Sequence, residues 1–309
     1  MTPAEIYGEF KKCGGVADLS ARAKLRLTGG DRVRFLNGQV SNDVRKLAEN
    51  GTLHACVLTA KGRLCADVFI ASSPDFLRVD AEPELRESLA ARLERCLIAD
   101  DVTLEDASEE MGLLHRIFPA GTQTGVHGDA AYQIFHANRF GSPGLDMVAP
   151  REAVAALRAS LSNDVPLLDA AMLETIRVEA GVPRWGFELG EEILPQEAGL
   201  DRDAIDFHKG CYVGQEVISR IKSVGHVNKQ LRGFVRIGED APLRAGMKLF
   251  APGHPEKEAG SITSAAYSFG LARHAALGYL KRGVSDAVLD ARDESGACRV
   301  ELKNLPLIP

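Results

Sequence analysis

A strand–proline–helix pattern occurs twice in the first half of the chain, and this repetition constrains the fold more than any other feature. An apolar run over residues 76–80 precedes Pro83, and a second run over residues 145–148 precedes Pro150. Each proline is followed by apolar residues at helical spacing: Leu85, Leu89 and Leu93 in the first copy, and Val154, Leu157 and Leu161 in the second. Proline suits the first turn of a helix, where its missing amide hydrogen would have no partner. The repeat predicts a pseudo-symmetric α+β lobe of the ferredoxin-like kind, with further strands over residues 112–118 and 132–135.

A hairpin is expected before the first copy of this pattern. Residues 52–59 and 63–71 are strand-like runs on either side of a short turn. In the second run Asp67 alternates onto the same face as Phe69 and Cys65. An acid on such a face is either an exposed edge residue or a functional carboxylate, and the pattern fits both equally.

Polar residues mark the ends of the expected helices. After a strand at 22–28, Asp31 and Asn42 are the expected N-caps of two short helices. In the middle of the chain Asp169 is expected to cap a longer helix, which Gly181 terminates.

The last part of the chain has the pattern of a small all-β barrel. Short alternating apolar runs recur there between Gly, Pro and Asp turns. They lie at residues 231–237, 247–250, 260–267, 277–280 and 299–302. We therefore expect a first domain of two lobes, residues 1–228, and a C-terminal β-barrel domain, residues 229–309.

Charge and composition argue against several classes of protein. The chain has 37 basic and 43 acidic residues, a net charge of −6, which disfavours bulk attraction to nucleic acid or to an anionic membrane. No apolar run reaches the ~20 residues of a membrane span. The first residues lack the basic and apolar regions of a secretory signal, so that a cytosolic protein is expected. The six cysteines are scattered without a C-x-x-C pair, and we predict no resident metal site.

The densest chemistry lies in residues 208–216 (HKGCYVGQE), which combine a thiol, an ammonium, an imidazole and a carboxylate. They follow residues 184–207, an acidic run without periodicity, which is either mobile or functional. Apolar residues at helical spacing follow Gly214, so Cys211 should lie just ahead of a short helix. The positive end of that helix and the ammonium of Lys209 would both favour the thiolate of Cys211. The alternative is a buried, unreactive cysteine, and the chemistry leaves both open.

A basic tract without an acid covers residues 219–237. Its cations are Arg220, Lys222, Lys229, Arg232 and Arg236. Such a tract is commonly a solvated face, but on an acidic protein it also fits a local site for an anionic ligand.

Residues 209–216 (KGCYVGQE) resemble the signature of YgfZ-type proteins. These are folate-binding factors of iron–sulfur cluster assembly or repair, related to the aminomethyltransferase (T-protein) of the glycine cleavage system. The resemblance extends over nearly the whole chain, and the segments other than the signature are shared with the transferases. They are residues 35–44 (FLNGQVSNDV), Gly62-Arg63 with Asp67, residues 177–181 (RVEAG) and residues 194–199 (LPQEAG).

The resemblance implies an α+β, aminomethyltransferase-like fold, in which a multi-lobed ring with a ferredoxin-like lobe is followed by an all-β barrel. It implies tetrahydrofolate as the cofactor, bound in a central funnel, with the pterin's paired donors on Glu179. Further folate-binding residues are predicted to be Asp67, Arg63 and, for the carboxylate tail, Arg220. The transferases have two adjacent acids in the hairpin, whereas the pair here is Ala66-Asp67, which puts aminomethyl transfer in doubt.

We therefore expect a tetrahydrofolate-binding accessory factor for the assembly or repair of [4Fe–4S] enzymes, with Cys211 as the active thiol and Lys209 as its aid. Its expected partners are iron–sulfur client enzymes and the assembly machinery. One alternative is a folate-dependent aminomethyltransferase or demethylase, which the single acid Asp67 disfavours. Another is a tRNA-modification or RNA-binding protein, which the net charge and an aromatic content of 6% disfavour. Whether the chain is an enzyme stays open at this point.

Overall fold

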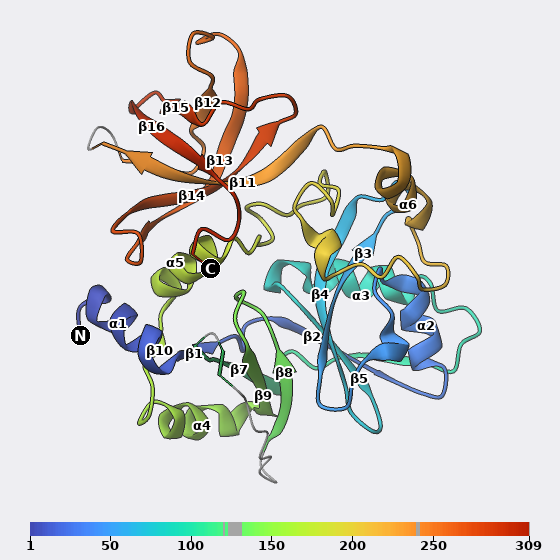
Figure 1. The fold of residues 1–309 in the computed structure, drawn as a ribbon. Helices are drawn as coiled ribbons and strands as arrows, with labels where there is room; N and C mark the ends of the chain where they lie inside the picture. Colours follow the sequence, from blue (N-terminus) through green and yellow to red (C-terminus); the bar gives the residue numbers. More distant parts are fainter. Residues whose placement is uncertain (120, 123–131, 239–241, 309) are drawn as a thin grey trace. The chain divides into compact units, whose positions relative to one another are not determined.

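We describe residues 1–119, 121–122, 132–238 and 242–308 of a computed structural model. The chain forms two compact units (Figure 1). The first consists of Met1–Leu168 and Leu200–Arg220, and the second of Asp169–Gly199 and Ile221–Pro309. The second unit thus includes a segment from the middle of the chain. The domain boundary expected at residue 228 stays a prediction.

Within the described residues, the first unit contains two five-stranded sheets. In spatial order, the first sheet has β3 (Thr52–Leu58), β4 (Leu64–Ser72), β5 (Leu77–Ala81), β2 (Ala23–Thr28) and β6 (Thr103–Asp106). The second sheet has β10 (Leu167–Leu168), β1 (Gly15–Asp18), β7 (Met111–Ile117), β9 (Gly144–Pro150) and β8 (Gln133–Ala137). Neighbouring strands run antiparallel, except that β1 and β10 are parallel.

The strand–proline–helix pattern is confirmed, and its two copies fall in different sheets. In the first copy β5 leads through the 3-10 turn η2 (Pro83–Leu85) into α3 (Arg86–Glu94). In the second, β9 leads through η3 (Arg151–Ala153) into α4 (Val154–Leu161). Both helices therefore begin with a tighter turn than the sequence pattern predicts.

The predicted hairpin is also confirmed. Strands β3 and β4 pair, with Cys56 opposite Asp67, and Gly62 N donates to Thr59 O at 2.9 Å in the turn between them. One face of β4 is fully buried, and its residues are Leu64, Ala66, Val68 and Ile70. On the opposite face Asp67 is half-buried, so it is neither a core residue nor fully solvated.

Of the two expected N-caps, Asp31 occupies the predicted position and Asn42 does not. Asp31 stands at the N-cap of α2 (Arg32–Gln39) but makes no capping hydrogen bond with its side chain. The second cap is Asp43, not Asn42: its carboxylate accepts from the amide of residue 45 in the 3-10 turn η1 (Val44–Lys46). The Asn42 amide instead donates to the backbone of two other segments, so tertiary contacts override its local capping preference.

In the second unit the predicted barrel is confirmed as a closed sheet (Figure 1, orange to red). Its order is β11 (Lys229–Ile237), β14 (Arg273–Lys281), β13 (Glu258–Ser268), β12 (Lys248–Phe250), β15 (Val288–Asp293) and β16 (Gly296–Lys303). The sequence pattern missed β15. Large apolar side chains fill the interior, among them Phe234, Met247, Leu249, Leu289 and Val300.

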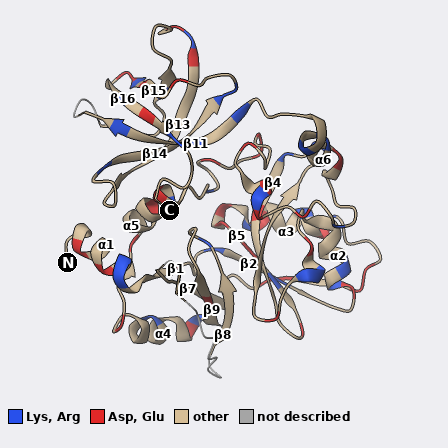
Figure 2. Cartoon of the chain, viewed as in Figure 1, with Lys and Arg blue, Asp and Glu red and all other residues tan. Residues whose placement is uncertain are grey.

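The helix expected in the middle of the chain is confirmed, whereas α1 (Pro3–Cys13) and η4 (Leu200–Arg202) were not predicted from the sequence. The helix expected after Asp169 is α5 (Ala170–Ala180): the Asp169 carboxylate accepts from Met172 N, and Gly181 ends the helix with φ of 71°. The other elements are α1, η4 and α6 (Gln215–Val224). Figure 2 shows acidic and basic residues interspersed over both units. Among the described residues, no helix has the length and apolar character needed to cross a membrane.

A buried ionic network joins the two sheets of the first unit. Asp80 on β5 and Asp146 on β9 are both 0% exposed. Arg139 bridges them, donating to both oxygens of Asp80 at 2.8 and 2.9 Å and to both oxygens of Asp146 at 2.6 and 2.8 Å. Arg22 donates to Asp80 at 2.8 Å, and His115 bonds to Asp146 at 2.9 Å. One guanidinium therefore connects strands that belong to different sheets.

These carboxylates are ionised in spite of their burial. Loss of hydration alone would raise the pKa of Asp146, but the charge and hydrogen bonds of Arg139 hold this pKa well below its usual range. The same opposition lowers the pKa of Asp80 to about 2. The network is stable only as a set, because each charge that is removed leaves a buried partner uncompensated.

Asp146→Asn tests this dependence. The variant keeps the size of the side chain but removes one of the two negative charges that Arg139 binds, which leaves the buried cations only partly compensated by Asp80. We therefore expect a loss of about 3–5 kcal/mol in the free energy of unfolding. Urea unfolding followed by circular dichroism measures it. Glu9→Gln is the control, because the pair of Glu9 with Lys12 is exposed and should contribute less than about 1 kcal/mol. Equal stability of the two variants would contradict a structural role for the network.

Candidate functional site

The segment that carries the expected thiol is held against the loop that follows α2. We call residues 203–214 the Cys211 loop. Ser41 Oγ donates to Ala204 O at 2.6 Å, and Asn42 Nδ2 donates to Asp203 O at 2.9 Å. The first half of the Cys211 loop is thereby fixed, although the sequence around it shows no periodicity.

Lys209 adds three further hydrogen bonds to these attachments. Its side chain is buried, with 5% of the residue exposed, and Nζ donates to Asn37 O and Val40 O at 2.6 Å and to Asn42 O at 2.8 Å. Burial lowers the pKa of Lys209 to about 8, while the nearby negative charge of Asp43 acts in the opposite direction. The sequence analysis assigned this ammonium to the thiolate of Cys211, a role that stays a prediction.

The second half of the Cys211 loop is fixed at Gly214. This residue has φ of 86°, a left-handed conformation that favours glycine, and a Cβ atom here would lie 2.6 Å from Thr59 O in the hairpin turn. From the other side, a Cβ atom at Gly62 would lie 3.0 Å from Val217. The two glycines let the loop and the hairpin turn approach closely.

Between these two attachments Cys211 is exposed. The other cysteines are half-buried or buried: Cys13, Cys65 and Cys96 are half-buried, and Cys56 and Cys298 are buried. The expected short helix after the thiol is confirmed as α6, which begins at Gln215. The exposure of Cys211 rules out the alternative in which it fills a core, while its reactivity stays a prediction.

A histidine that the sequence analysis did not select connects the hairpin to the Cys211 loop. His54 on β3 bonds through Nε2 to Asp67 Oδ1 at 2.6 Å and through Nδ1 to Asp203 Oδ2 at 3.3 Å. Its ring stacks on Phe69, with centroids 4.6 Å apart and planes 5° apart. Alternate residues of a strand share a face, so His54 lies on the same face of β3 as Cys56, which pairs with Asp67 on β4. This alternation was the signal in the sequence that could have selected His54.

Two carboxylates keep His54 in its charged form. Burial alone would lower the pKa of His54, but the charge of Asp67 and the hydrogen bonds to Asp203 and Asp67 raise it to about 10. Near neutral pH, His54 is therefore an imidazolium and Asp67 the carboxylate that it pairs with. Asp67 thus has a cationic partner in His54.

Phe69 links this pair to the buried network. The Cζ atom of Arg139 lies 4.2 Å from the centroid of the Phe69 ring, on which His54 also stacks. Two cations in contact with one ring are each stabilised by its negative face. A continuous set of contacts therefore runs from the network through Phe69 to His54 and Asp67.

Glu179 lies in the second unit, near the end of α5. Its side chain is buried, with 6% of the residue exposed, and Oε1 accepts from Ser268 Oγ at 2.6 Å and from Gly270 N at 3.3 Å. These donors fix the orientation of the carboxylate. A buried and oriented carboxylate is the type of acceptor that the paired donors of a pterin require.

The two predicted arginines lie on the first unit. Arg63 is half-buried beside the hairpin turn, where its amide donates to Thr59 Oγ1 at 3.2 Å. Arg220 is exposed on α6. The first unit thus holds Cys211, Lys209, Asp67, Arg63 and Arg220, and the second holds Glu179. Among the described residues, no group of three or more His, Cys, Asp or Glu side chains could hold a metal ion.

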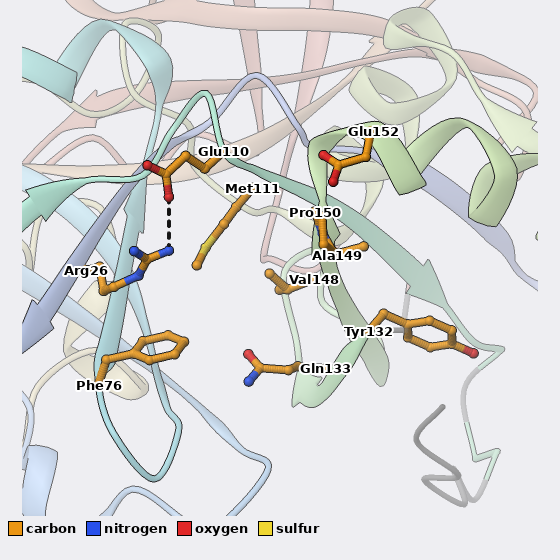
Figure 3. Close-up of a pocket in the computed structure, with 10 residues that line it drawn as sticks. All are labelled: Arg26, Phe76, Glu110, Met111, Tyr132, Gln133, Val148, Ala149, Pro150 and Glu152. Carbon is orange, nitrogen blue, oxygen red and sulfur yellow. Dashed lines mark hydrogen bonds and ion pairs between the residues drawn. The ribbon is translucent and has the colours of Figure 1, made fainter. Parts of the chain in front are cut away.

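A surface depression of about 690 Å³ lies elsewhere on the first unit (Figure 3). Its lining comes from both sheets and includes Phe76, Met111, Val148 and, at its rim, Arg26 paired with Glu110 at 3.2 Å. None of the catalytic or folate-binding residues predicted from the sequence lines it.

The fold places the chain in a structural class. It superposes with a TM-score of 0.82 on the crystal structure of the glycine cleavage system aminomethyltransferase T from Bartonella henselae, over 95% of this chain and 86% of that one, at 17% identity. The predicted fold class, aminomethyltransferase-like with a C-terminal β-barrel, is confirmed.

Relatives found by sequence similarity have names that refer to iron–sulfur cluster assembly and to YgfZ. An iron–sulfur cluster assembly factor IBA57 homolog, mitochondrial, from Phaeosphaeria nodorum is 28% identical over 231 residues, which are 70% of this chain and 54% of that protein. The tRNA-modifying protein YgfZ of Sodalis glossinidius is 26% identical over 217 residues, 66% of each chain. No family model matches the chain. The resemblance to YgfZ-type proteins that the sequence analysis noted is confirmed, since a YgfZ protein is among the relatives of this chain.

The charged state of His54 generates a pH-dependent prediction. A pKa raised from 6.5 to about 10 contributes stability that is fully present below pH 6.5 and is lost as the pH rises through 10. His54→Asn should therefore be less stable than the wild type by about 1.5–3 kcal/mol at pH 6, and the difference should shrink towards pH 10. Urea unfolding at pH 6, 8 and 10 measures it. His208→Asn, at an exposed position, is the control, and a difference for His54→Asn that stayed constant over this range would contradict the charged pair.

Proposed function

We propose that this protein is a tetrahydrofolate-binding accessory factor for the assembly or repair of iron–sulfur enzymes of the [4Fe–4S] type, with Cys211 as the active thiol. The observation that carries the proposal is the exposure of Cys211 on a loop whose two ends are fixed to the rest of the first unit. A thiol displayed in this way can reach a client protein or a cluster in transfer. The relatives named for iron–sulfur cluster assembly and YgfZ support the same role.

The folate part of the proposal rests on the fold and on Glu179. The aminomethyltransferase fold is shared with a folate-dependent class, and the Glu179 carboxylate suits the donors of a pterin. Asp67 and Arg63 are proposed at the folate nitrogens and Arg220 at the carboxylate tail. Bound folate would supply a one-carbon carrier, while the residues of this chain would orient it and exclude water.

Iron–sulfur client enzymes and the assembly machinery are the proposed partners, and a cytosolic location is part of the proposal. A role in tRNA modification is named for the Sodalis relative. For this chain the net charge of −6 disfavours direct RNA binding.

A folate-dependent aminomethyltransferase is the second candidate, because the solved structure with this fold has that activity in its name. The hairpin argues against it. Ala66 stands where the transferases have a second acid, and the remaining carboxylate, Asp67, is paired with the His54 imidazolium. Transfer of the carbon of an aminomethyl-loaded lipoyl carrier to tetrahydrofolate, with release of ammonia, would identify a transferase, and its absence is expected.

Cys211→Ser tests the central proposal. The substitution removes the thiol at almost constant volume, so the fold and folate binding should survive while support of iron–sulfur enzymes is lost. The assay is the activity of [4Fe–4S] enzymes in a strain that lacks this protein and carries either form. Cys298→Ser, which alters a buried thiol of the barrel, is the control. Full complementation by Cys211→Ser would sink the proposal.

Glu179→Gln tests the folate site. The amide exchanges one acceptor for a donor, so binding of tetrahydrofolate should weaken by about 1.5–3 kcal/mol. Titration calorimetry of the pure protein measures the dissociation constant. Glu192→Gln, an exposed acid of the same unit, should bind like the wild type. An unchanged constant for Glu179→Gln would remove this residue from the site.

A further inference from the structure

We infer that Lys209 is a positioning residue for Cys211: its ammonium clamps the end of α2 and thereby sets where the Cys211 loop displays its thiol. The inference deepens the proposed function and rests on the role proposed there for Cys211. It differs from the sequence-based expectation, in which the Lys209 charge acts directly on the thiolate.

The geometry of the ammonium carries the inference. A lysine Nζ has three donors, and here three carbonyls accept from it, those of Asn37, Val40 and Asn42, at 2.6, 2.6 and 2.8 Å. The side chain crosses from the Cys211 loop into a buried position to reach them. Its donors are thus matched by carbonyls on a different segment.

The position of those carbonyls explains why a cation is suited to this place. Asn37 lies in the last turn of α2, whose final carbonyls have no amide partner within the helix. The helix dipole places partial negative charge at this end, which favours a cation. Val40 and Asn42 extend the same backbone beyond the helix.

The clamp is one of several attachments, and the others survive its removal. Ser41 still holds Ala204, and Gly214 still packs against the hairpin turn. A variant without the ammonium should therefore fold, while the residues between these attachments, including Cys211, should lose their fixed position.

The two roles of Lys209 make different predictions for Lys209→Met, which keeps the apolar stem and removes the donors. If Lys209 is a clamp, amide hydrogen exchange in residues 37–43 and 205–213 should accelerate by about tenfold or more, because three carbonyls lose their partner. The midpoint of the pH profile of Cys211 alkylation should stay unchanged. If Lys209 instead stabilises the thiolate, that midpoint should rise by about one pH unit or more while exchange stays as in the wild type.

The experiment combines hydrogen exchange by mass spectrometry, iodoacetamide alkylation of Cys211 between pH 5.5 and 9.5 with peptide mapping, and complementation of the deletion strain. Lys46→Met is the matched control: Lys46 pairs with Asp206 of the same loop at 2.6 Å, but its side chain is 62% exposed. It should change exchange by no more than about twofold.

Lys209→Gln, which keeps a donor on a shorter chain, replaces Lys209→Met if that variant does not fold. Its amide exchange should be faster than that of the wild type and slower than that expected for Lys209→Met. Unaltered exchange in the Lys209 variants would overturn the clamp, as would a raised alkylation midpoint without faster exchange. The failure of the proposed function would look different: Cys211→Ser would then complement the deletion, while the exchange data would still decide whether Lys209 is a clamp.

Discussion

The first unit depends on two buried carboxylates that stay ionised inside the protein. Asp80 and Asp146 come from different sheets, and Arg139 binds both. The desolvation of these groups is offset only when all of them are present and correctly placed, so the network fixes the two sheets in one arrangement. The same arginine contacts Phe69, against which His54 stacks, and the network therefore extends to the surface of the hairpin.

From the hairpin, polar contacts continue to the Cys211 loop. His54 bonds to Asp203 at one end of this loop, and the backbone at the end of α2 holds it through Lys209. A segment without helix or strand is thus fixed by side chain–backbone bonds and by one close glycine contact at Gly214. Such a construction keeps a polar loop on the surface while it restricts where the thiol can lie.

The fold alone does not decide the chemistry, because one scaffold serves several activities. The aminomethyltransferase architecture is shared, but the hairpin carboxylate Asp67 has an imidazolium as its partner, and an exposed thiol lies on the neighbouring loop. Both differences concern charge and exposure at particular residues. They are the features on which the proposed accessory role rests.

Much of the fold could be predicted from the sequence, because it follows from local periodicity. The repeated strand–proline–helix pattern, the hairpin, the helix between Asp169 and Gly181 and the barrel strands are set by alternation and by capping residues that act over a few positions. The signature around Cys211 likewise indicated a thiol ahead of a short helix.

Only the tertiary structure decided what each polar group contacts. Nothing in the local sequence pairs Asp80 with Asp146, selects His54 as the partner of Asp67, or turns the Lys209 ammonium towards the carbonyls of α2. The prediction of Asn42 as an N-cap, which relied on local sequence alone, was wrong. Its amide donates instead to two backbone segments that are distant in the chain. Hydrogen bonds and ion pairs between residues far apart in the chain depend on short distances and on burial, and both exist only once the sheets and loops have packed.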